Sequence, residues 1–156
     1  MTKRKLGPFE IETVGLGCMS LSHSYGPPPS DADGAKLLNR ALDLGYDFLD
    51  TASIYGVGHN ETLIGQALKG RRDEFVLASK CGLRVGNDEA RATRMLDGSP
   101  AGIAEVLDLS LSRLGVDHID LYYLHRLDPK TPIEESVGAL ADAVKAGKIR
   151  SIGLSE

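Results

Sequence analysis

A single rhythm runs through this sequence: a short apolar run, a polar loop, an amphipathic segment, and then another apolar run. The apolar runs have the length of buried strands, and the segments between them repeat their apolar residues with the period of a helix. Strands that alternate with helices predict parallel βαβ units with right-handed crossovers. The expected strands are residues 13–17, 46–50, 75–80, 119–125 and 149–155.

Start and stop signals bound the amphipathic segments. Ser30 or Asp31 is the candidate N-cap of one segment, and Ser99 precedes another. Gly45 and Gly115 follow the same two segments as candidate stops. Residues 59–61 are expected to begin a further helix and to support the strand ends. The expected helices are residues 31–44, 61–68, 100–114 and 133–146.

Residues 5–6 and 9–11, on either side of Gly7-Pro8, predict a small hairpin ahead of the main sheet. A hairpin, five strands and four helices suit two architectures. One is a complete, small, open α/β sheet, and the other is a little more than half of a (β/α)8 barrel, which needs eight strands and about 250 residues. Either way, we expect residues 1–156 to form a single domain, with residues 81–98 as a long loop over the strand ends.

Charge, apolar content and cysteine count each argue against a class of protein. The formal net charge is −4 with no long block of one sign, whereas a nucleic-acid-binding protein needs a basic face. No stretch approaches the ~20 apolar residues of a membrane span, and no apolar signal region opens the chain. Two cysteines cannot form a secreted disulfide framework, and they show no zinc spacing with the four histidines. We therefore expect a cytoplasmic protein without metal.

Polar residues end the predicted strands. Asp50 ends the second, Lys80 the third and His125 the fourth, while Tyr55 follows Asp50 by five residues. The C-terminal ends of parallel strands meet at one mouth, where α/β-barrel enzymes carry their active sites. The four side chains are therefore expected to lie together at this mouth.

These residue types suit the reduction of a carbonyl group. The carbonyl oxygen gains negative charge as it accepts a hydride, so it needs a proton in the transition state. A tyrosine can donate that proton if a neighbouring ammonium group stabilises its phenolate. A carboxylate keeps the ammonium charged and in place, and a neutral histidine can donate a hydrogen bond to the substrate oxygen. No metal is required.

At these positions the sequence resembles the aldo-keto reductase family. The motifs that carry the resemblance cover the whole chain, and the first one points to the branch that contains pyridoxal reductases and general aldehyde or ketone reductases. They are GLGCMSLSHSYG at 15–26, DTASIYG at 50–56, NETLIGQAL at 60–68, ASK at 78–80, LSRLGVDHIDLYYLHR at 111–126 and GKIRSIGLSE at 147–156.

The resemblance implies a role for each matching residue. Tyr55 would be the acid, Lys80 the cation that activates it, Asp50 the partner of the lysine, and His125 the residue that orients the substrate. The cofactor would be NADP(H) rather than NAD, and the substrate a small aldehyde or ketone. The implied cofactor contacts are Gly17, Cys18, Met19, Asp50, Ser155 and Glu156, although many family members have Asn in place of Glu156.

The resemblance also implies that family members continue beyond the fifth strand. They add three more strands, the residue that stacks on the nicotinamide, and the site for the 2′-phosphate. The sequence therefore predicts the N-terminal portion of a barrel with open edges. We expect either a fragment of a longer reductase or self-association of two copies through the open edge.

Two alternatives to the reductase remain open. The chain could be an inert fragment, or a cofactor-binding or interaction module of the same fold. It could also be an aldolase that forms a Schiff base on Lys80, because such lysines also end barrel strands.

Overall fold

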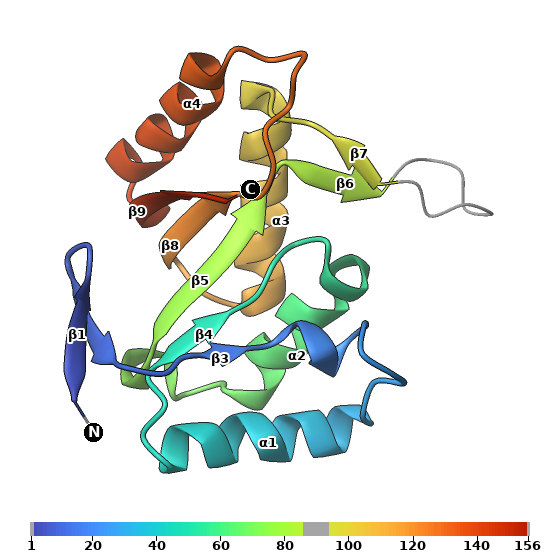
Figure 1. Ribbon diagram of the computed structural model, residues 1–156, viewed down its shortest axis with the longest axis vertical. Helices are drawn as coiled ribbons and strands as arrows, with labels where there is room; N and C mark the ends of the chain where they lie inside the picture. Colours follow the sequence, from blue (N-terminus) through green and yellow to red (C-terminus); the bar gives the residue numbers. More distant parts are fainter. Residues whose placement is uncertain (1, 86–93, 156) are drawn as a thin grey trace.

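The computed structural model describes residues 2–85 and 94–155. Its elements follow the predicted order, and the predicted N-terminal hairpin is confirmed (Figure 1). The strands are β1 (Lys3–Leu6), β2 (Phe9–Glu12), β3 (Leu16–Gly17), β4 (Phe48–Asp50), β5 (Val76–Cys81), β6 (Leu83–Val85), β7 (Arg94–Leu96), β8 (Ile119–Leu124) and β9 (Ile149–Leu154). The helices are α1 (Asp31–Asp43), α2 (His59–Ala67), α3 (Pro100–Leu114) and α4 (Ile133–Lys145), with short 3-10 turns η1 (Met19–Leu21), η2 (Tyr55–Gly58) and η3 (Arg72–Glu74).

The main sheet is parallel and has the order β3-β4-β5-β8-β9. Each strand lies beside the next one of this series along the chain, as the βα rhythm predicts. The register pairs Asp50 with Ala78, and Lys80 with Tyr123. Because paired residues of neighbouring strands face the same side of a sheet, Asp50 and Lys80 share one face. Among the described residues, β3 and β9 are the two edges of this sheet.

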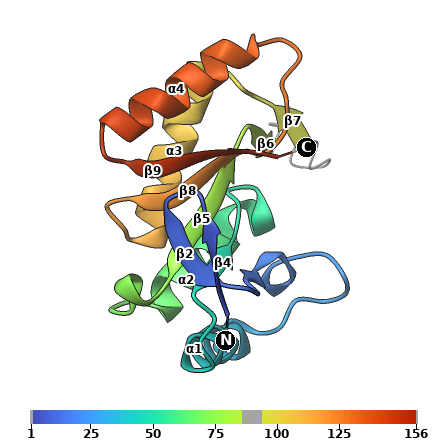
Figure 2. The ribbon, with the colours of Figure 1, turned by 60° about the vertical axis from the view of Figure 1, so that its left-hand side comes forward.

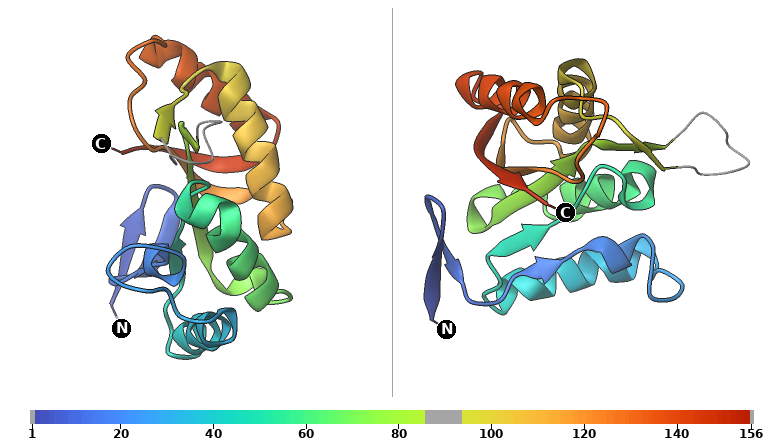
Figure 3. Two further views of the ribbon diagram at one scale, coloured as in Figure 1. Left: turned by 90° about the vertical axis from the view of Figure 1, so that its right-hand side faces the viewer. Right: turned by 45° about the horizontal axis from the view of Figure 1, so that its top comes forward.

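The four helices all cover the other face of the sheet (Figure 3). The predicted caps hold where the structure shows them. The hydroxyl oxygen of Ser30 accepts from the Asp33 N–H at 3.2 Å, and that of Ser99 accepts from the Gly102 N–H at 3.1 Å. Gly115 ends α3 with a φ of 65°, a conformation that favours glycine. Local sequence signals therefore determine where these helices begin and end.

The hairpin β1–β2 lies beside the N-terminal ends of the strands (Figure 2). Asp47, which directly precedes β4, holds it there: its carboxylate accepts from the Glu12 N–H at 2.8 Å and lies 3.7 Å from the Lys3 ammonium. The strand predicted at residues 13–17 is shorter than expected, because β3 pairs with β4 only from Leu16 onward.

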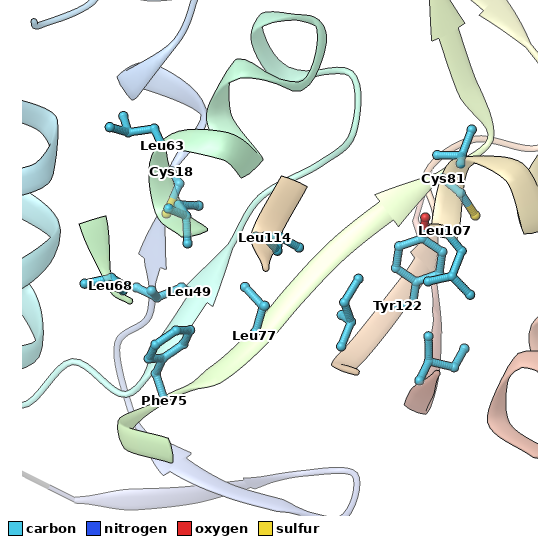
Figure 4. Packing of buried hydrophobic residues seen from close by; sticks show 14 of the residues in the cluster. Cys18, Leu49, Leu63, Leu68, Phe75, Leu77, Cys81, Leu107, Leu114 and Tyr122 are labelled. Atoms are coloured by element: carbon cyan, nitrogen blue, oxygen red, sulfur yellow. The ribbon is translucent and has the colours of Figure 1, made fainter. Parts of the chain in front are cut away.

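The hydrophobic core lies between the sheet and the helices (Figure 4). Leu49, Leu77 and Tyr122 come from three neighbouring strands, and each is at most 1% exposed. Burial of such a side chain stabilises the fold by about 1.5–3 kcal/mol. Helices α2 and α3 complete this core with residues such as Leu63 and Leu107.

Helix α2 touches the end of α3 through a glycine. A Cβ on Gly65 would lie 2.5 Å from the backbone oxygen of Leu114. Only a residue without a side chain permits this approach of helix to backbone. The contact holds α2 at a definite distance from α3.

The region predicted as one long loop, residues 81–98, contains the antiparallel pair β6–β7, so that prediction was wrong in part. Residues 86–93 lie outside the described residues. Arg84 holds the base of the pair through Asp97 at 2.9 Å and Glu105 at 2.6 Å. The residues of β7 are all exposed, so the sequence lacks the alternation of apolar and polar residues that predicts a half-buried strand.

Candidate active site

The four residues predicted at the strand ends do lie together. Asp50 is the last residue of β4, Lys80 is the penultimate residue of β5, and His125 directly follows β8. Tyr55 opens the turn η2, which follows β4. All four therefore occupy the C-terminal edge of three neighbouring strands.

Lys80 is nearly buried, and its ammonium has two acceptors. Its Nζ donates to Asp50 Oδ1 at 2.5 Å and to the backbone oxygen of Thr51 at 2.8 Å. The side chain is only 9% exposed. A buried ammonium is tolerated when it is paired and hydrogen-bonded in this way. An amine nucleophile needs a free lone pair, so this arrangement does not favour the Schiff-base alternative.

The ring of Tyr55 lies between charged and aromatic neighbours. Lys80 Nζ is 5.2 Å from the ring centroid of Tyr55. The His125 ring meets it edge-on at 5.9 Å, and the His23 ring lies 5.5 Å away on a tilt. A positive charge and two imidazoles thus surround one phenol.

An unusual turn places Tyr55 there. Gly56 has a φ of 57° and Val57 a φ of 56°, and Val57 is β-branched. A β-branched residue in the left-handed region is strained, and such strain is concentrated at functional sites. A Cβ on Gly56 would also lie 2.8 Å from the Cβ of Ser22, so the turn requires glycine at this position.

His125 is neutral near pH 7. Burial, and then the positive charges of Lys80, Arg126 and Arg94, lower the pKa of its imidazole to about 4. Its Nδ1 is buried without a hydrogen-bond partner among the described residues. A neutral imidazole in this place can donate one hydrogen bond to a ligand while adding no charge.

Asn60, at the start of α2, connects three parts of the site. It is fully buried, and its Oδ1 accepts from the Thr51 hydroxyl at 2.6 Å. Its Nδ2 donates to the Cys18 carbonyl at 2.8 Å and to Ser22 Oγ at 2.7 Å. The sequence predicts that this helix start supports the rim, and the structure confirms it. The connection from Asn60 through Thr51 to Lys80 has no signal in the sequence.

Glu61 lies behind β5, on the face opposite Lys80. Its side chain is fully buried and accepts from the Ser79 hydroxyl at 2.7 Å and from Arg113 at 3.3 Å. Burial raises the pKa of this carboxyl group, while Ser79 and Arg113 oppose the rise. Residues 60 and 61 thus bind, from one helix end, the segments that follow β3 and β4 and the strand β5.

The residues implied as cofactor contacts differ in what they offer. Gly17 is exposed, and nothing lies within 4 Å of the place of its missing Cβ, so a ligand can approach the backbone. Met19 and Ser155 are half-buried. Cys18 is buried: its N–H donates to the backbone oxygen of Asp50, its carbonyl accepts from Asn60, and burial raises the pKa of its thiol to about 12. Glu156 lies outside the described residues.

A cavity of about 430 Å³ opens beside Tyr55. Its volume suits a small ligand. It is lined by Met19, His23, Ser24, Ile54, Tyr55, Leu83, Arg94, His125 and Arg126.

Metal sites and membrane spans are both absent from the described part of the chain. No group of three or more His, Cys, Asp or Glu side chains is placed there to hold a metal ion. None of the helices in those residues is both long enough and apolar enough to cross a membrane.

Comparison with known proteins identifies relatives over almost the whole chain. The aldo-keto reductase yakc of Schizosaccharomyces pombe, whose name specifies NADP(+), is 47% identical over 155 residues, which are 98% of this chain and 45% of the relative. A probable aldo-keto reductase 1 of Glycine max is 41% identical over an alignment that covers 97% of this chain and 44% of the relative. The chain therefore spans about half the length of the curated relatives it matches.

The solved structures lead to the same family. The holo form of an aldo-keto reductase from Bacillus halodurans superposes with a TM-score of 0.87 at 37% identity, covering 99% of this chain and 50% of that one. The glycerol dehydrogenase of Gluconobacter oxydans superposes with a TM-score of 0.88 at 35% identity, covering 97% of this chain and 47% of that one. The fold is thus the hairpin and five βα strands of a (β/α)8 barrel, and the open-sheet alternative falls away. Since the model of the aldo/keto reductase family also matches residues 13–156, the chain belongs to that family.

Proposed function

We propose that this chain carries the proton-donating part of the active site of an NADPH-dependent reductase of aldehydes and ketones. One observation supports the proposal above all others. The ion pair between Lys80 and Asp50 lies next to the ring of Tyr55, and the neutral imidazole of His125 meets the same ring edge-on.

Each of the four side chains has a part in this chemistry. Tyr55 donates its phenolic proton to the carbonyl oxygen of the substrate as that oxygen gains charge. The Lys80 ammonium stabilises the phenolate that remains, and Asp50 holds the ammonium in place. His125, being neutral, donates a hydrogen bond to the same oxygen and orients the carbonyl.

The chain offers a place for the cofactor at the edges of the described sheet. Gly17 leaves its backbone accessible at the end of β3, and the half-buried Met19 and Ser155 follow β3 and β9. We assign the cofactor contacts to Gly17, Met19, Asp50, Ser155 and Glu156, with the Cys18 backbone supporting them. When bound, NADPH supplies the hydride. NADP is preferred over NAD because the name of the S. pombe relative specifies it.

The proposal extends to the setting of the protein. The substrate is a small carbonyl compound that enters the cavity beside Tyr55. Both cysteines are free thiols, which suits the reducing conditions of the cytoplasm. The single-domain organisation of residues 1–156 is part of the same proposal.

The direct test follows NADPH oxidation by absorbance, with a panel of aldehydes and the complete protein that carries this chain. We expect turnover, and a loss of about 10²–10⁴-fold in kcat for Tyr55→Phe. Tyr46→Phe, at the opposite end of the sheet, is the matched control and should retain activity. Full activity in Tyr55→Phe would remove Tyr55 as the acid.

The two open edges favour a second candidate function, that of a cofactor-binding or interaction module of the same fold. Strands β3 and β9 each have a neighbour on one side only in the described sheet, and such edges invite pairing with another chain. Tight NADPH binding in a fluorescence titration without any turnover would favour this candidate. Light scattering would show whether two copies associate through the edge.

A further inference from the structure

The cavity beside Tyr55 has a charge that differs from that of the chain. Arg94 and Arg126 line it together with His23 and His125, and its described lining contains no carboxylate. The chain as a whole has a net charge of −4. A cleft lined by one sign of charge concentrates ligands of the opposite sign. The positive charge of this cavity is therefore a local property and does not follow from the net charge of the chain.

The two arginines line the same cavity as three neighbouring rings. The Tyr55 ring lies 5.5 Å from the His23 ring and 5.9 Å from the His125 ring, measured between centroids. The Arg94 guanidinium contacts Nε2 of His23 at 3.4 Å. Arg126 follows His125 and donates to its backbone oxygen at 2.8 Å. A carbonyl group held at Tyr55 would thus share one cavity with the positive charges of Arg94 and Arg126.

The described contacts of these two arginines also differ from those of the structural arginines. Arg71, Arg72 and Arg84 each bind a carboxylate at 2.9 Å or less. In the part of the chain that the structure describes, Arg94 and Arg126 bind neutral groups instead: an imidazole, a backbone oxygen and, at 3.3 Å, the Ser155 hydroxyl. Among the described residues, no carboxylate therefore competes with a ligand for their donors.

We propose that the carbonyl substrate carries an anionic group, a carboxylate or a phosphate monoester, which Arg94 and Arg126 recognise. The inference rests on the proposed function, whose substrate class it narrows. A guanidinium donates paired, charge-assisted hydrogen bonds to carboxylate and phosphate oxygens. These contacts hold the far end of the substrate while Tyr55 and His125 engage its carbonyl oxygen.

The phosphates of NADPH share this anionic chemistry, so the experiment must separate substrate from cofactor. The probes are 4-carboxybenzaldehyde and its neutral methyl ester, which differ in charge and carry the same reacting group. The complete protein is assayed with each aldehyde, and the KM for NADPH is measured in parallel. The variants are Arg94→Gln and Arg126→Gln, with Arg4→Gln on the exposed β1 strand as the control.

We expect the wild type to prefer the carboxylate over the ester in kcat/KM. In Arg94→Gln or Arg126→Gln, kcat/KM for the carboxylate should fall about tenfold or more beyond any fall for the ester. Arg4→Gln should keep the wild-type ratio. Added salt should reduce the preference, because it screens the attraction between the charges. Circular dichroism confirms that the variants fold.

Three outcomes would overturn the inference, and they differ in what they say of the proposed function. Turnover of both aldehydes without a preference that depends on the arginines removes the inference and leaves the proposed function standing. Arginine variants that raise the KM for NADPH, with an unchanged ratio of the two aldehydes, assign the arginines to the cofactor. No turnover of either aldehyde by the wild type removes both.

Discussion

The two faces of the five-stranded sheet are built on different principles. On the face toward the helices, Leu49, Leu77 and Tyr122 are almost completely buried. On the inward face, Asp50, Lys80 and Tyr123 alternate with these residues on the same strands and lie in a network of charges and rings. Stability is therefore concentrated on one side of the strands, and the proposed chemistry on the other.

Residues of one strand can therefore be tested independently when their side chains face opposite sides of the sheet. Substitution of a side chain that faces the helices should lower the free energy of unfolding with little effect on the chemistry of the folded protein. Substitution of a side chain on the inward face should lower activity with a smaller effect on the free energy of unfolding. Four experiments test whether the two faces are separate in this way, and the substitution of Lys80 has the largest expected effect.

Lys80→Met should reduce kcat of the complete protein by about 10²–10⁴-fold, because the phenolate formed at Tyr55 loses its stabilising charge. Methionine keeps much of the length of the lysine, so the cooperative unfolding transition should remain. Steady-state kinetics and thermal unfolding of the same sample check both statements. A variant that retains activity would separate Lys80 from the chemistry.

Leu77→Ala, three residues earlier and on the opposite face, should lower the free energy of unfolding by about 2–5 kcal/mol, since it leaves a cavity in the core. Denaturant unfolding measures this loss. Val76, which faces inward on the same strand, is half-buried, so Val76→Ala is the control and should cause a smaller loss. Equal losses would show that the two faces do not differ in this way.

Thr51→Val should cost about 1–3 kcal/mol in the free energy of unfolding, because it leaves the buried Asn60 oxygen without its donor. Thr51→Ser keeps the hydroxyl and should restore most of that stability. If Asn60 also positions Lys80 through Thr51, kcat should fall in the valine variant and recover in the serine variant. Unfolding and kinetics together distinguish support from positioning.

The pH dependence of stability should carry a small contribution from His125. Its pKa is about 4 in the folded protein and about 6.5 when unfolded, so the unfolded chain binds more protons between these values. The contribution is complete above pH 6.5 and is lost as the pH falls through 4. Relative to His125→Gln, the wild type should lose about 1–2 kcal/mol across this window. Parallel curves for the two proteins would contradict the assignment.

The sequence predicts most of the fold because its signals are local. Ser99 and Gly115 bound α3 as expected, and the strand ends of Asp50, Lys80 and His125 meet because consecutive parallel strands are neighbours. The pair β6–β7 escapes prediction because the residues of β7 are all exposed and show no alternation of apolar and polar residues, and because ion pairs of Arg84 hold it in place. The burial of Cys18 and the link from Asn60 to Lys80 depend on side-chain packing between elements, which no periodicity reveals.

The contact between Gly65 and the end of α3 limits how far α2 can move relative to the candidate site. Asn60 lies five residues before Gly65 on the same rigid helix, about 7.5 Å along its axis. Any side chain that pushed α2 away from α3 would therefore move Asn60 and Glu61 with it, and both hold strand ends of the candidate site. The positions of the reactive groups thus depend on a contact between two helices that takes no part in the chemistry itself.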